Sequence, residues 1–409
     1  MTHLTREDAE ARDAASPLRG RRELFDLPDG VVYLCGNSLG ALPRHVPDRL
    51  AAVVRREWGS ELVRGWNSAD WTHLNARCGA RIAPLIGAAP EDVTVGDSTS
   101  VTLFKAMVAA ARLRPDRRVV VLEPTTFPTD GYVAQGVAAL LDLELRWCDP
   151  ADPAASLDED VAVLALTHVD FRSGAMFDLP GLTAAAHAVG AVTLWDLCHS
   201  TGAVPVDLAA ADADLAVGCT YKYLNGGPGS PAFVWAAPRL QDSLDQPITG
   251  WWGHAAPFEM HRDFEPAPGI QRMVVGTPPV LALSALESAL EVFDGVATAD
   301  LRAASLALTD HLVELVESRV DGFELITPRE HERRGSQVSF RHPDAYGVVQ
   351  ALIARGVVGD FRTPDVARFG VAPLYVRHVD LWDAVEHLVT VMESEEHLDP
   401  AYARRLAVT

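Results

Sequence analysis

Short apolar runs alternate with alanine-rich stretches through the middle of the chain, from about residue 90 to residue 240. Apolar runs without regular polar positions are typical of strands buried on both faces, and the alanine-rich segments between them, such as 182–189, favour helix. This order predicts a mostly parallel sheet covered by helices on both sides, with ligands bound at the carboxyl ends of its strands. The apolar runs are 118–122, 143–147, 161–166, 191–195, 215–218 and 232–235.

A different pattern begins after the proline pair at 278–279. Proline cannot extend a helix backwards, so we expect a helix over 280–293, and a second one over 298–320. Strand-like segments follow these helices, which predicts a smaller α+β domain. The two segments are 323–326 and 337–340.

The length of 409 residues exceeds what a single hydrophobic core usually serves, which favours two domains that share one site. No low-complexity linker separates the two patterns, so the domains should be packed against each other. We expect a large domain over 51–295. The N-terminal segment 1–50 and residues 296–409 should together form the small C-terminal domain.

The charge of the chain limits its partners. Acidic residues outnumber basic ones, 56 to 35, and the net charge of -21 repels nucleic acid and acidic membrane surfaces. The N-terminus lacks the apolar core of a secretory signal, and no later run is long enough to span a membrane. We therefore expect a cytoplasmic protein whose partners are a small molecule and another protein subunit, with no nucleic acid and no membrane.

Several common ligand signatures are missing. Neither a GxGxxG turn nor a GxxxxGK[ST] loop is present, so no dinucleotide or P-loop site is indicated. The five cysteines are scattered and never form a CxxC pair, which indicates neither a disulfide framework nor a zinc knuckle. His254 and His261 lack the spacing of helical metal ligands, so we expect no metal.

Lysine is nearly absent from the chain. Of the 35 basic residues, only Lys105 and Lys222 are lysines. Arginine cannot lose its proton near neutral pH, so a nucleophilic amine has no arginine substitute, and each lysine becomes a candidate for such a role. The alternative is that a lysine survives by chance on the surface. We expect this of Lys105, as a solvated helix residue.

Asp196 ends one predicted strand, and Lys222 follows the next one, so both should emerge at the same edge of the sheet. Pyridoxal phosphate requires such a pair: a lysine to hold it as a Schiff base, and a carboxylate to keep its pyridine nitrogen protonated. His199 lies close to Asp196 in the sequence. An ordinary buried ion pair, or a capping aspartate beside a core histidine, explains these residues equally well or better when they are taken alone.

Two further segments fit the same cofactor. The hydroxyl-rich run 96–102 precedes a helix expected to begin near Leu103, and a helix start of this kind can bind phosphate. Phe127 follows a predicted strand and could stack on the cofactor ring. An ordinary helix cap and a core aromatic are the commoner explanations of each feature singly. Phosphate loop, aromatic ring, carboxylate and lysine nevertheless occur in sequence order, each at a strand end.

Several motifs give the chain a more specific resemblance. In order and spacing they are similar to kynureninase, and they extend over nearly the whole sequence. The resemblance implies a pyridoxal-phosphate-dependent transferase fold of type I, with a large cofactor-binding domain carrying a mostly parallel seven-stranded sheet, a smaller α+β C-terminal domain, and a homodimer with shared active sites. The motifs are LCGNSLG at 34–40, FPTD at 127–130, WDLCHS at 195–200, YKYLNGGPG at 221–229, GWWGH at 250–254 and RFGVAPLY at 368–375.

The resemblance also implies residue roles. Lys222 should carry the cofactor, Asp196 should pair with the pyridine nitrogen with support from His199, and Tyr221 should act in acid-base steps, so that Lys222, Tyr221 and Asp196 form the catalytic set. The cofactor-binding residues implied are Val101, Thr102, Phe127, Asp130, Asp196, His199, Tyr221 and Lys222, with Trp251 and Thr277 contributed by the second subunit. The implied substrate-binding residues are Arg368, Asn37, Ser60, Trp66 and Gly276.

The implied reaction is hydrolysis of the Cβ–Cγ bond of L-kynurenine to anthranilate and L-alanine, a step of tryptophan catabolism. Ser60, Gly276 and Thr277 resemble the bacterial form, which favours L-kynurenine over 3-hydroxykynurenine. Another reaction of the same superfamily, such as cysteine desulfuration or decarboxylation, would share Asp196 and Lys222. A non-catalytic regulator that binds the cofactor would need a DNA-binding domain, which this acidic chain lacks.

Overall fold

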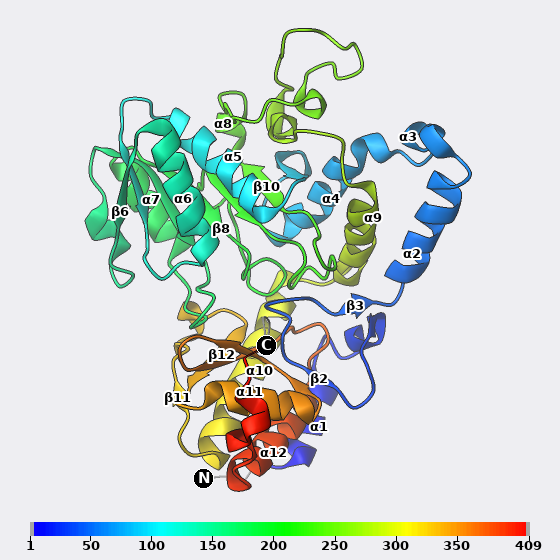
Figure 1. Ribbon diagram of the computed structural model, residues 1–409, viewed down its shortest axis with the longest axis vertical. Coiled ribbons are helices and arrows are strands. Elements are labelled where there is room, and N and C mark those ends of the chain that lie inside the picture. Colours follow the sequence, from blue (N-terminus) through cyan, green and yellow to red (C-terminus); the bar gives the residue numbers. More distant parts are fainter. Residues whose placement is uncertain (1–3, 406–409) are drawn as a thin grey trace.

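A computed structural model describes residues 4–405, and its central feature is a seven-stranded sheet (Figure 1). The strands lie in the order β4-β10-β9-β8-β7-β5-β6. All neighbours from β9 to β6 are parallel, whereas β10 is antiparallel to both β9 and β4, so β4 again runs in the direction of β9. The mostly parallel sheet is therefore confirmed. Its strands are β4 (Val93–Val95), β5 (Val119–Leu122), β6 (Glu144–Trp147), β7 (Val161–Thr167), β8 (Val192–Asp196), β9 (Leu215–Gly218) and β10 (Phe233–Ala236).

Helices bury both faces of this sheet, which explains why its strands lack polar alternation. Along β5, Val119 and Val121 belong to one core cluster, and Val120 and Leu122 belong to another. The first cluster includes side chains of α4, α7 and α9, and the second includes side chains of α5 and α6. The bounds of these helices are α4 (Leu74–Ile82), α5 (Thr99–Arg112), α6 (Pro128–Leu141), α7 (Leu179–Ala188) and α9 (Val280–Ala289), the last continuing as a 3-10 turn over Leu290–Phe293.

The start of α5 corrects one expectation. The helix begins at Thr99, not near Leu103. Ser98 is its N-cap, and the Ser98 hydroxyl accepts a hydrogen bond from the Val101 backbone N–H at 3.4 Å. The hydroxyl-rich run is therefore mostly the first turn of the helix instead of a loop before it.

A second, antiparallel sheet lies in the C-terminal part, in the order β11-β12-β15-β14. It packs with three helices, which confirms the smaller α+β unit. The strands are β11 (Glu324–Leu325), β12 (Gln337–Arg341), β14 (Asp360–Arg362) and β15 (Val366–Gly370), and the helices are α10 (Thr298–Arg319), α11 (Ala345–Ala354) and α12 (His378–Glu393). The domain boundaries at residues 50 and 295 stay a prediction.

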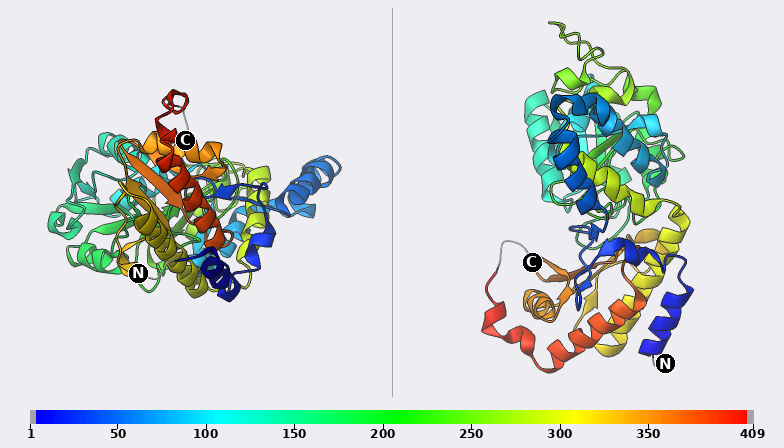
Figure 2. Two further views of the ribbon diagram at one scale, coloured as in Figure 1. Left: turned by 90° about the horizontal axis from the view of Figure 1, so that it is seen from below. Right: turned by 90° about the vertical axis from the view of Figure 1, so that its right-hand side faces the viewer.

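The N-terminal segment is built into this second unit (Figure 2). Helix α1 (Arg6–Ala15) packs against α12, and β2 (Val32–Tyr33) pairs in parallel with β13 (Val357–Val358). The short strands β1 (Phe25–Asp26) and β3 (Leu42–Pro43) pair with each other, and the chain then enters α2 (Val46–Ala52), a π-helical extension over Val53–Trp58, and α3 (Gly65–Ser68). The short helix α8 (Pro238–Gln241) follows the last strand of the large sheet. Among the described residues, none of the helices combines the length and apolarity needed to cross a bilayer.

Candidate active site

The carboxyl ends of β4, β5, β7, β8 and β9 meet at one edge of the large sheet, because these strands all run in the same direction. Asp196 is the last residue of β8, and Lys222 follows the end of β9. Phe127 follows β5 and is the N-cap of α6. The topology therefore assembles the residues that the sequence placed at strand ends.

The Lys222 amine lies at the centre of this group. Its Nζ donates to His199 Nε2 at 2.8 Å, and it lies 5.8 Å from the centre of the Phe127 ring. The N-terminal segment reaches the same point, because the Gly40 N–H donates to the Tyr221 carbonyl at 2.7 Å. A Cβ at Gly40 would lie 2.3 Å from the Lys222 carbonyl oxygen, so only glycine permits this approach.

The tautomer of His199 follows from its neighbours. Gln337 Nε2 donates to the Phe171 carbonyl at 3.0 Å, which turns Gln337 Oε1 toward His199 Nδ1, 3.2 Å away. Since that oxygen can only accept, Nδ1 carries the hydrogen and Nε2 offers its lone pair to the Lys222 amine. Burial, followed by the nearby charges of Lys222 and Arg368, holds the pKa of His199 well below its ordinary value, so the ring is neutral. Asn37 Nδ2 donates to the same Gln337 oxygen at 3.2 Å.

Two carboxyl groups lie buried near the amine. Burial, followed by the charge of Asp196, raises the pKa of Asp130 well above its ordinary value. Thr126 Oγ1 donates to Asp130 Oδ2 at 3.0 Å, and the Cys198 N–H donates to Asp196 Oδ1 at 2.8 Å. No hydrogen bond joins His199 to Asp196 in the part of the chain that the structure describes, so the expected support of Asp196 by His199 stays a prediction.

Tyr221 precedes the lysine, and its ring centre is 5.9 Å from Lys222 Nζ. The side chain is half-buried. Burial, followed by the charges of Cys219 and Cys198, raises the pKa of the Tyr221 phenol. A phenol with a raised pKa keeps its proton at neutral pH and can therefore serve as a proton donor.

The start of α5 lies beside this group, after β4. The first N–H groups of a helix have no partner within the helix, and the helix dipole favours an anion there. Val101 is partly exposed, at 36%, whereas Thr102 is buried and its hydroxyl donates to the Gly96 carbonyl at 3.0 Å. The Thr102 hydroxyl is thus engaged by the turn that leads into the helix.

Lys105 is not the solvated residue that the sequence suggested. Its side chain is 1% exposed, and Nζ donates to Asp97 Oδ2 and to the Met273 carbonyl, each at 2.5 Å. The expectation failed because a single lysine on an alanine-rich helix gives no sign of which face it occupies, and the partner carbonyl is distant in sequence.

Arg368 lies on β15, directly opposite Asp360 on β14. Both side chains are 1% exposed, and Arg368 Nε donates to Asp360 Oδ1 at 2.6 Å. Arg368 also donates to Ser38 Oγ at 2.8 Å and to the Phe171 carbonyl. Arg362 donates to the same Asp360 at 3.0 Å, so two guanidinium groups face one carboxylate and the cluster retains a positive charge.

The remaining predicted residues lie apart from Lys222 in this chain. Trp251 is exposed at 38%, and its ring contacts Trp252, which in turn contacts Trp66. Gly276 and Thr277 are exposed in the segment before α9. Ser60 is exposed as well, and its hydroxyl donates to the Arg55 carbonyl at 3.3 Å. The structure of one chain therefore does not bring these five residues to the amine.

Sequence reasoning missed four residues that contact the group. Gln337 and Asp360 lie on the small sheet, and Phe171 lies after β7, where its ring packs edge to face on Phe127 with centres 5.3 Å apart. Ser38 lies inside the GNSLG motif, so it is the one residue of these four that a sequence motif could have indicated. The other three are single residues in strands or a loop, and no local pattern distinguishes them.

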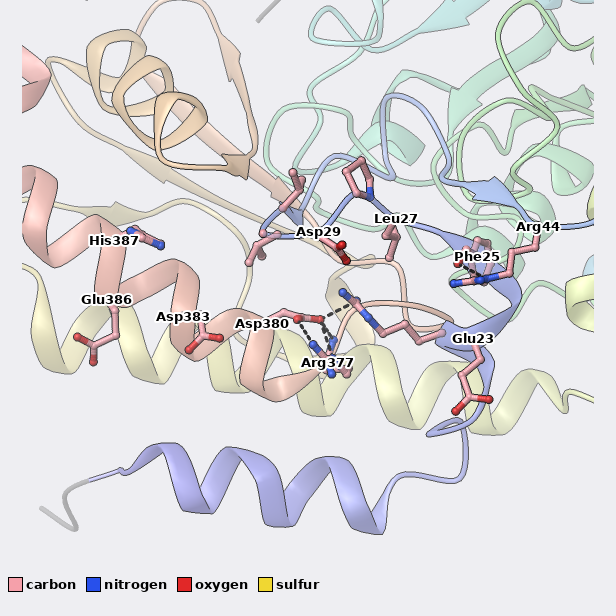
Figure 3. Close-up of a pocket in the computed structure, with 15 residues that line it drawn as sticks. Glu23, Phe25, Leu27, Asp29, Arg44, Arg377, Asp380, Asp383, Glu386 and His387 are labelled. Atoms are coloured by element: carbon pink, nitrogen blue, oxygen red, sulfur yellow. Dashed lines mark hydrogen bonds and ion pairs between the residues drawn. The ribbon is translucent and has the colours of Figure 1, made fainter. Parts of the chain in front are cut away.

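A cavity elsewhere in the molecule does not compete for this role. It has a volume of about 630 Å³ and lies between the N-terminal segment and α12 (Figure 3). Arg22 donates to Asp380 at 2.9 Å, and Arg377 donates to the same carboxylate at 2.8 Å. Its guanidinium groups are thus paired within the protein, and none of the predicted site residues lines it.

Residues 4–405 offer neither a metal site nor an exposed cysteine nucleophile. No group of three or more His, Cys, Asp or Glu side chains there could hold a metal ion. His254 is buried and its ring lies 3.2 Å from the Asp263 carbonyl, so it is a hydrogen-bonded histidine. All five cysteines are free and buried, so none is an exposed nucleophile.

The site fits pyridoxal phosphate on three grounds. An amine with one hydrogen-bond partner faces an aromatic ring. Burial, followed by the charge of Asp196, raises the pKa of Asp130, and the positive charge of a protonated pyridine nitrogen beside these two carboxyls would oppose that shift. The start of α5 offers N–H groups to a phosphate.

Comparison with known proteins gives the same assignment. Residues 301–388 match the family model described as the kynureninase C-terminal domain. The kynureninase of Burkholderia mallei (strain SAVP1) is 54% identical over 99% of this chain and 100% of its own length, and that of Pseudomonas fluorescens is 49% identical over the same shares. The apo structure of a cysteine desulfurase from Thermococcus onnurineus NA1 aligns with a TM-score of 0.76 at 17% identity, covering 92% of this chain and 97% of that one. That likeness confirms the type I fold, and identity of this extent along the whole chain shows that the protein belongs to the kynureninase family.

Proposed function

We propose that the chain is a kynureninase, which uses pyridoxal phosphate to hydrolyse the Cβ–Cγ bond of L-kynurenine and release anthranilate and L-alanine. The observation that carries this proposal is the position of the Lys222 amine. It faces the Phe127 ring and is oriented by a hydrogen bond to a neutral His199. When bound, pyridoxal phosphate supplies an electron sink that stabilises negative charge on the carbons of an amino-acid substrate.

The residues of this chain divide the remaining work. Lys222 would hold the cofactor through its amine and would move protons at the substrate α-carbon. His199 accepts a hydrogen bond from that amine, and this hydrogen bond fixes the orientation of the amine. Asp196 would pair with the ring nitrogen of the cofactor and keep it protonated. Tyr221 keeps its proton at neutral pH and can deliver it to a developing carbanion or carbonyl oxygen.

Substrate binding falls to the cluster on the small sheet. The planar guanidinium group of arginine binds a carboxylate with two parallel hydrogen bonds. Arg362 and Arg368 share one carboxylate, Asp360, so the cluster has a net positive charge that suits the α-carboxylate of an amino acid. Asn37 donates to Gln337, and its own Oδ1 is buried without a protein partner among residues 4–405. It is therefore available to a substrate donor. Ser60, Trp66 and Gly276 complete the predicted substrate contacts.

A homodimer accounts for the residues that lie away from Lys222. Large apolar side chains are exposed around the start of α9, including Leu281 at 43% and Trp58 at 57%. They line an apolar cavity of about 530 Å³ with Val53, Trp71 and the segment 278–282. A second subunit would cover this surface and bring its own Trp251 and Thr277 to the phosphate. Leu281→Arg should then give a monomer in sedimentation velocity, and an unchanged dimer would contradict this interface.

We further propose cytoplasmic location and a preference for L-kynurenine over 3-hydroxykynurenine. The absence of an exposed cysteine argues against a desulfurase, whose mechanism needs a thiol that can reach the substrate. A decarboxylase or a regulator has no specific observation in its favour.

The decisive experiment compares the unaltered protein with its Lys222→Ala variant. Each is incubated with L-kynurenine and with 3-hydroxykynurenine, and the fluorescence of the aromatic product, anthranilate or 3-hydroxyanthranilate respectively, is followed together with L-alanine. Release of both products that depends on Lys222 is expected, and a higher kcat/KM for L-kynurenine would establish the preference. A cofactor-loaded protein that releases neither product would refute the assignment.

A further inference from the structure

Lys105 occupies an unusual place for a lysine. It lies on α5 with its side chain 1% exposed, and its amine has two partners, the Asp97 carboxylate and the Met273 carbonyl. Side chains on a helix point back toward its N-terminus, so the amine reaches beneath the first turn of α5. The mechanism proposed above does not use this residue.

The first partner controls where α5 begins. Asp97 joins β4 to the helix in a left-handed conformation, with φ of 58°, and its carbonyl accepts from the Ala232 N–H at 2.9 Å. Ser98 follows it as the N-cap, and Val101 and Thr102 lie in the first turn. An ion pair that fixes the Asp97 side chain therefore fixes the direction in which the first N–H groups of the helix point.

The second partner belongs to the segment that leads to Thr277. Met273 ends a 3-10 turn, and the next residue, Val274, lies against the turn that leads into α5: a Cβ at Gly96 would be 3.5 Å from the Val274 Cγ1. Val275 accepts from the Trp252 N–H at 3.1 Å, so the turn that carries Trp251 sits on the same segment. Lys105 thus connects the helix start expected to contact the phosphate of its own subunit with the segment expected to reach the phosphate of the second subunit.

Burying an ammonium group is unfavourable unless it is paired, and an apolar side chain of similar length would fill the same space without that cost. The chain otherwise places arginine where a positive charge is needed, and Lys222 is the one other lysine. The larger guanidinium would not fit between a carboxylate and a carbonyl that both lie 2.5 Å from the amine. Burial also lowers the pKa of Lys105, and the Asp97 charge opposes that shift.

We propose that Lys105 is a positioning residue for the cofactor phosphate: it holds the start of α5 in the arrangement that binds the phosphate of its own subunit, and the 273–277 segment in the arrangement that reaches the phosphate of the second subunit. This inference rests on the proposed function, because it assumes pyridoxal phosphate as the ligand. In this role Lys105 acts through Asp97 and the Met273 carbonyl, its two hydrogen-bond partners.

The test measures binding instead of turnover. The full-length chain is freed of cofactor and titrated with pyridoxal phosphate and with pyridoxal, which lacks the phosphate, and absorbance reports binding of each. Lys105→Met should raise the Kd for pyridoxal phosphate about tenfold or more, the effect of losing well-aligned charge-assisted hydrogen bonds, and leave the Kd for pyridoxal within about twofold. Asp97→Asn, which keeps the size of the side chain, should act in the same direction.

Val108→Ala is the matched control, because Val108 is fully buried on α5 and its apolar side chain cannot form a hydrogen bond or an ion pair. A purely structural role for Lys105 predicts equal losses for both ligands in Lys105→Met and in the control, and that result would overturn the proposal. If Lys105→Met does not fold, Asp97→Asn decides in the same way. Failure of the unaltered chain to bind pyridoxal phosphate would overturn the proposed function itself.

Discussion

The ion pair between Asp360 and Arg368 allows a quantitative prediction. The two residues are cross-strand neighbours, and each side chain is 1% exposed. Asp360→Asn keeps the shape but removes the negative charge, and it turns an amide N–H toward groups that donate to the carboxylate. Arg362 and Ser38, which donate to Asp360 Oδ2 at 3.0 and 2.5 Å, would lose their acceptor as well.

The expected cost follows from burial. Breaking a buried pair by removing one partner destabilises a protein by about 3–5 kcal/mol, because the other charge stays buried and unpaired. Asparagine keeps one acceptor oxygen, so the lower end, about 3 kcal/mol, is expected. Asp142→Asn is the matched control: its carboxylate is 97% exposed and pairs with Arg118, and such pairs contribute about 0–1 kcal/mol.

Urea unfolding followed by circular dichroism measures both changes as shifts in the free energy of unfolding. A double-mutant cycle with Arg368→Met adds a second criterion. The double variant should cost less than the sum of the single ones, since it leaves fewer charges buried. A loss in Asp360→Asn within about 1 kcal/mol of the Asp142→Asn loss, or simple additivity in the cycle, would refute this reasoning.

The same pair has a pH signature. Burial alone would raise the pKa of Asp360, but the hydrogen bond and charge of Arg368, with the charge of Arg362, outweigh it and lower the pKa below the ordinary 3.8. A carboxyl whose pKa is depressed by folding stabilises the protein above its unfolded value and loses that effect as the pH falls through its folded value. The difference between the unaltered chain and Asp360→Asn should therefore be constant above about pH 5 and shrink below it.

Two further predictions concern the amine and its acids. Gln337→Met removes the acceptor that fixes the His199 tautomer, so kcat/KM should fall about 10- to 100-fold, the equivalent of one unsatisfied buried donor; stopped-flow or steady-state rates at full value would contradict this. Asp130→Asn removes a carboxyl whose pKa folding raises, and the stability attributable to Asp130 is present below its unfolded pKa and lost as the pH rises through its folded pKa. The cofactor-free Asp130→Asn chain should thus melt higher than the unaltered chain at pH 8, with a smaller gain at pH 4. A gain independent of pH would show that another interaction is responsible.

The sequence by itself determined the class of fold and the identity of the amine. Apolar runs at 161–166 and 191–195 carry no polar alternation because helices cover both faces of the sheet, and that pattern survives without any knowledge of contacts. Lys222 could also be identified from the sequence alone. In a chain with two lysines, a function that arginine cannot perform narrows the choice to very few positions.

The tertiary structure decided which polar side chains share a charge or a proton. Gln337 contacts His199 from a strand 138 positions away, and Asp360 pairs with Arg368 across two neighbouring strands; a single polar residue in a strand has no period that could mark its partner. The same holds for Lys105, whose burial depends on a carbonyl 168 positions away. Periodicity reports the face of an element that meets the core, whereas a hydrogen bond depends on distances that only packing fixes.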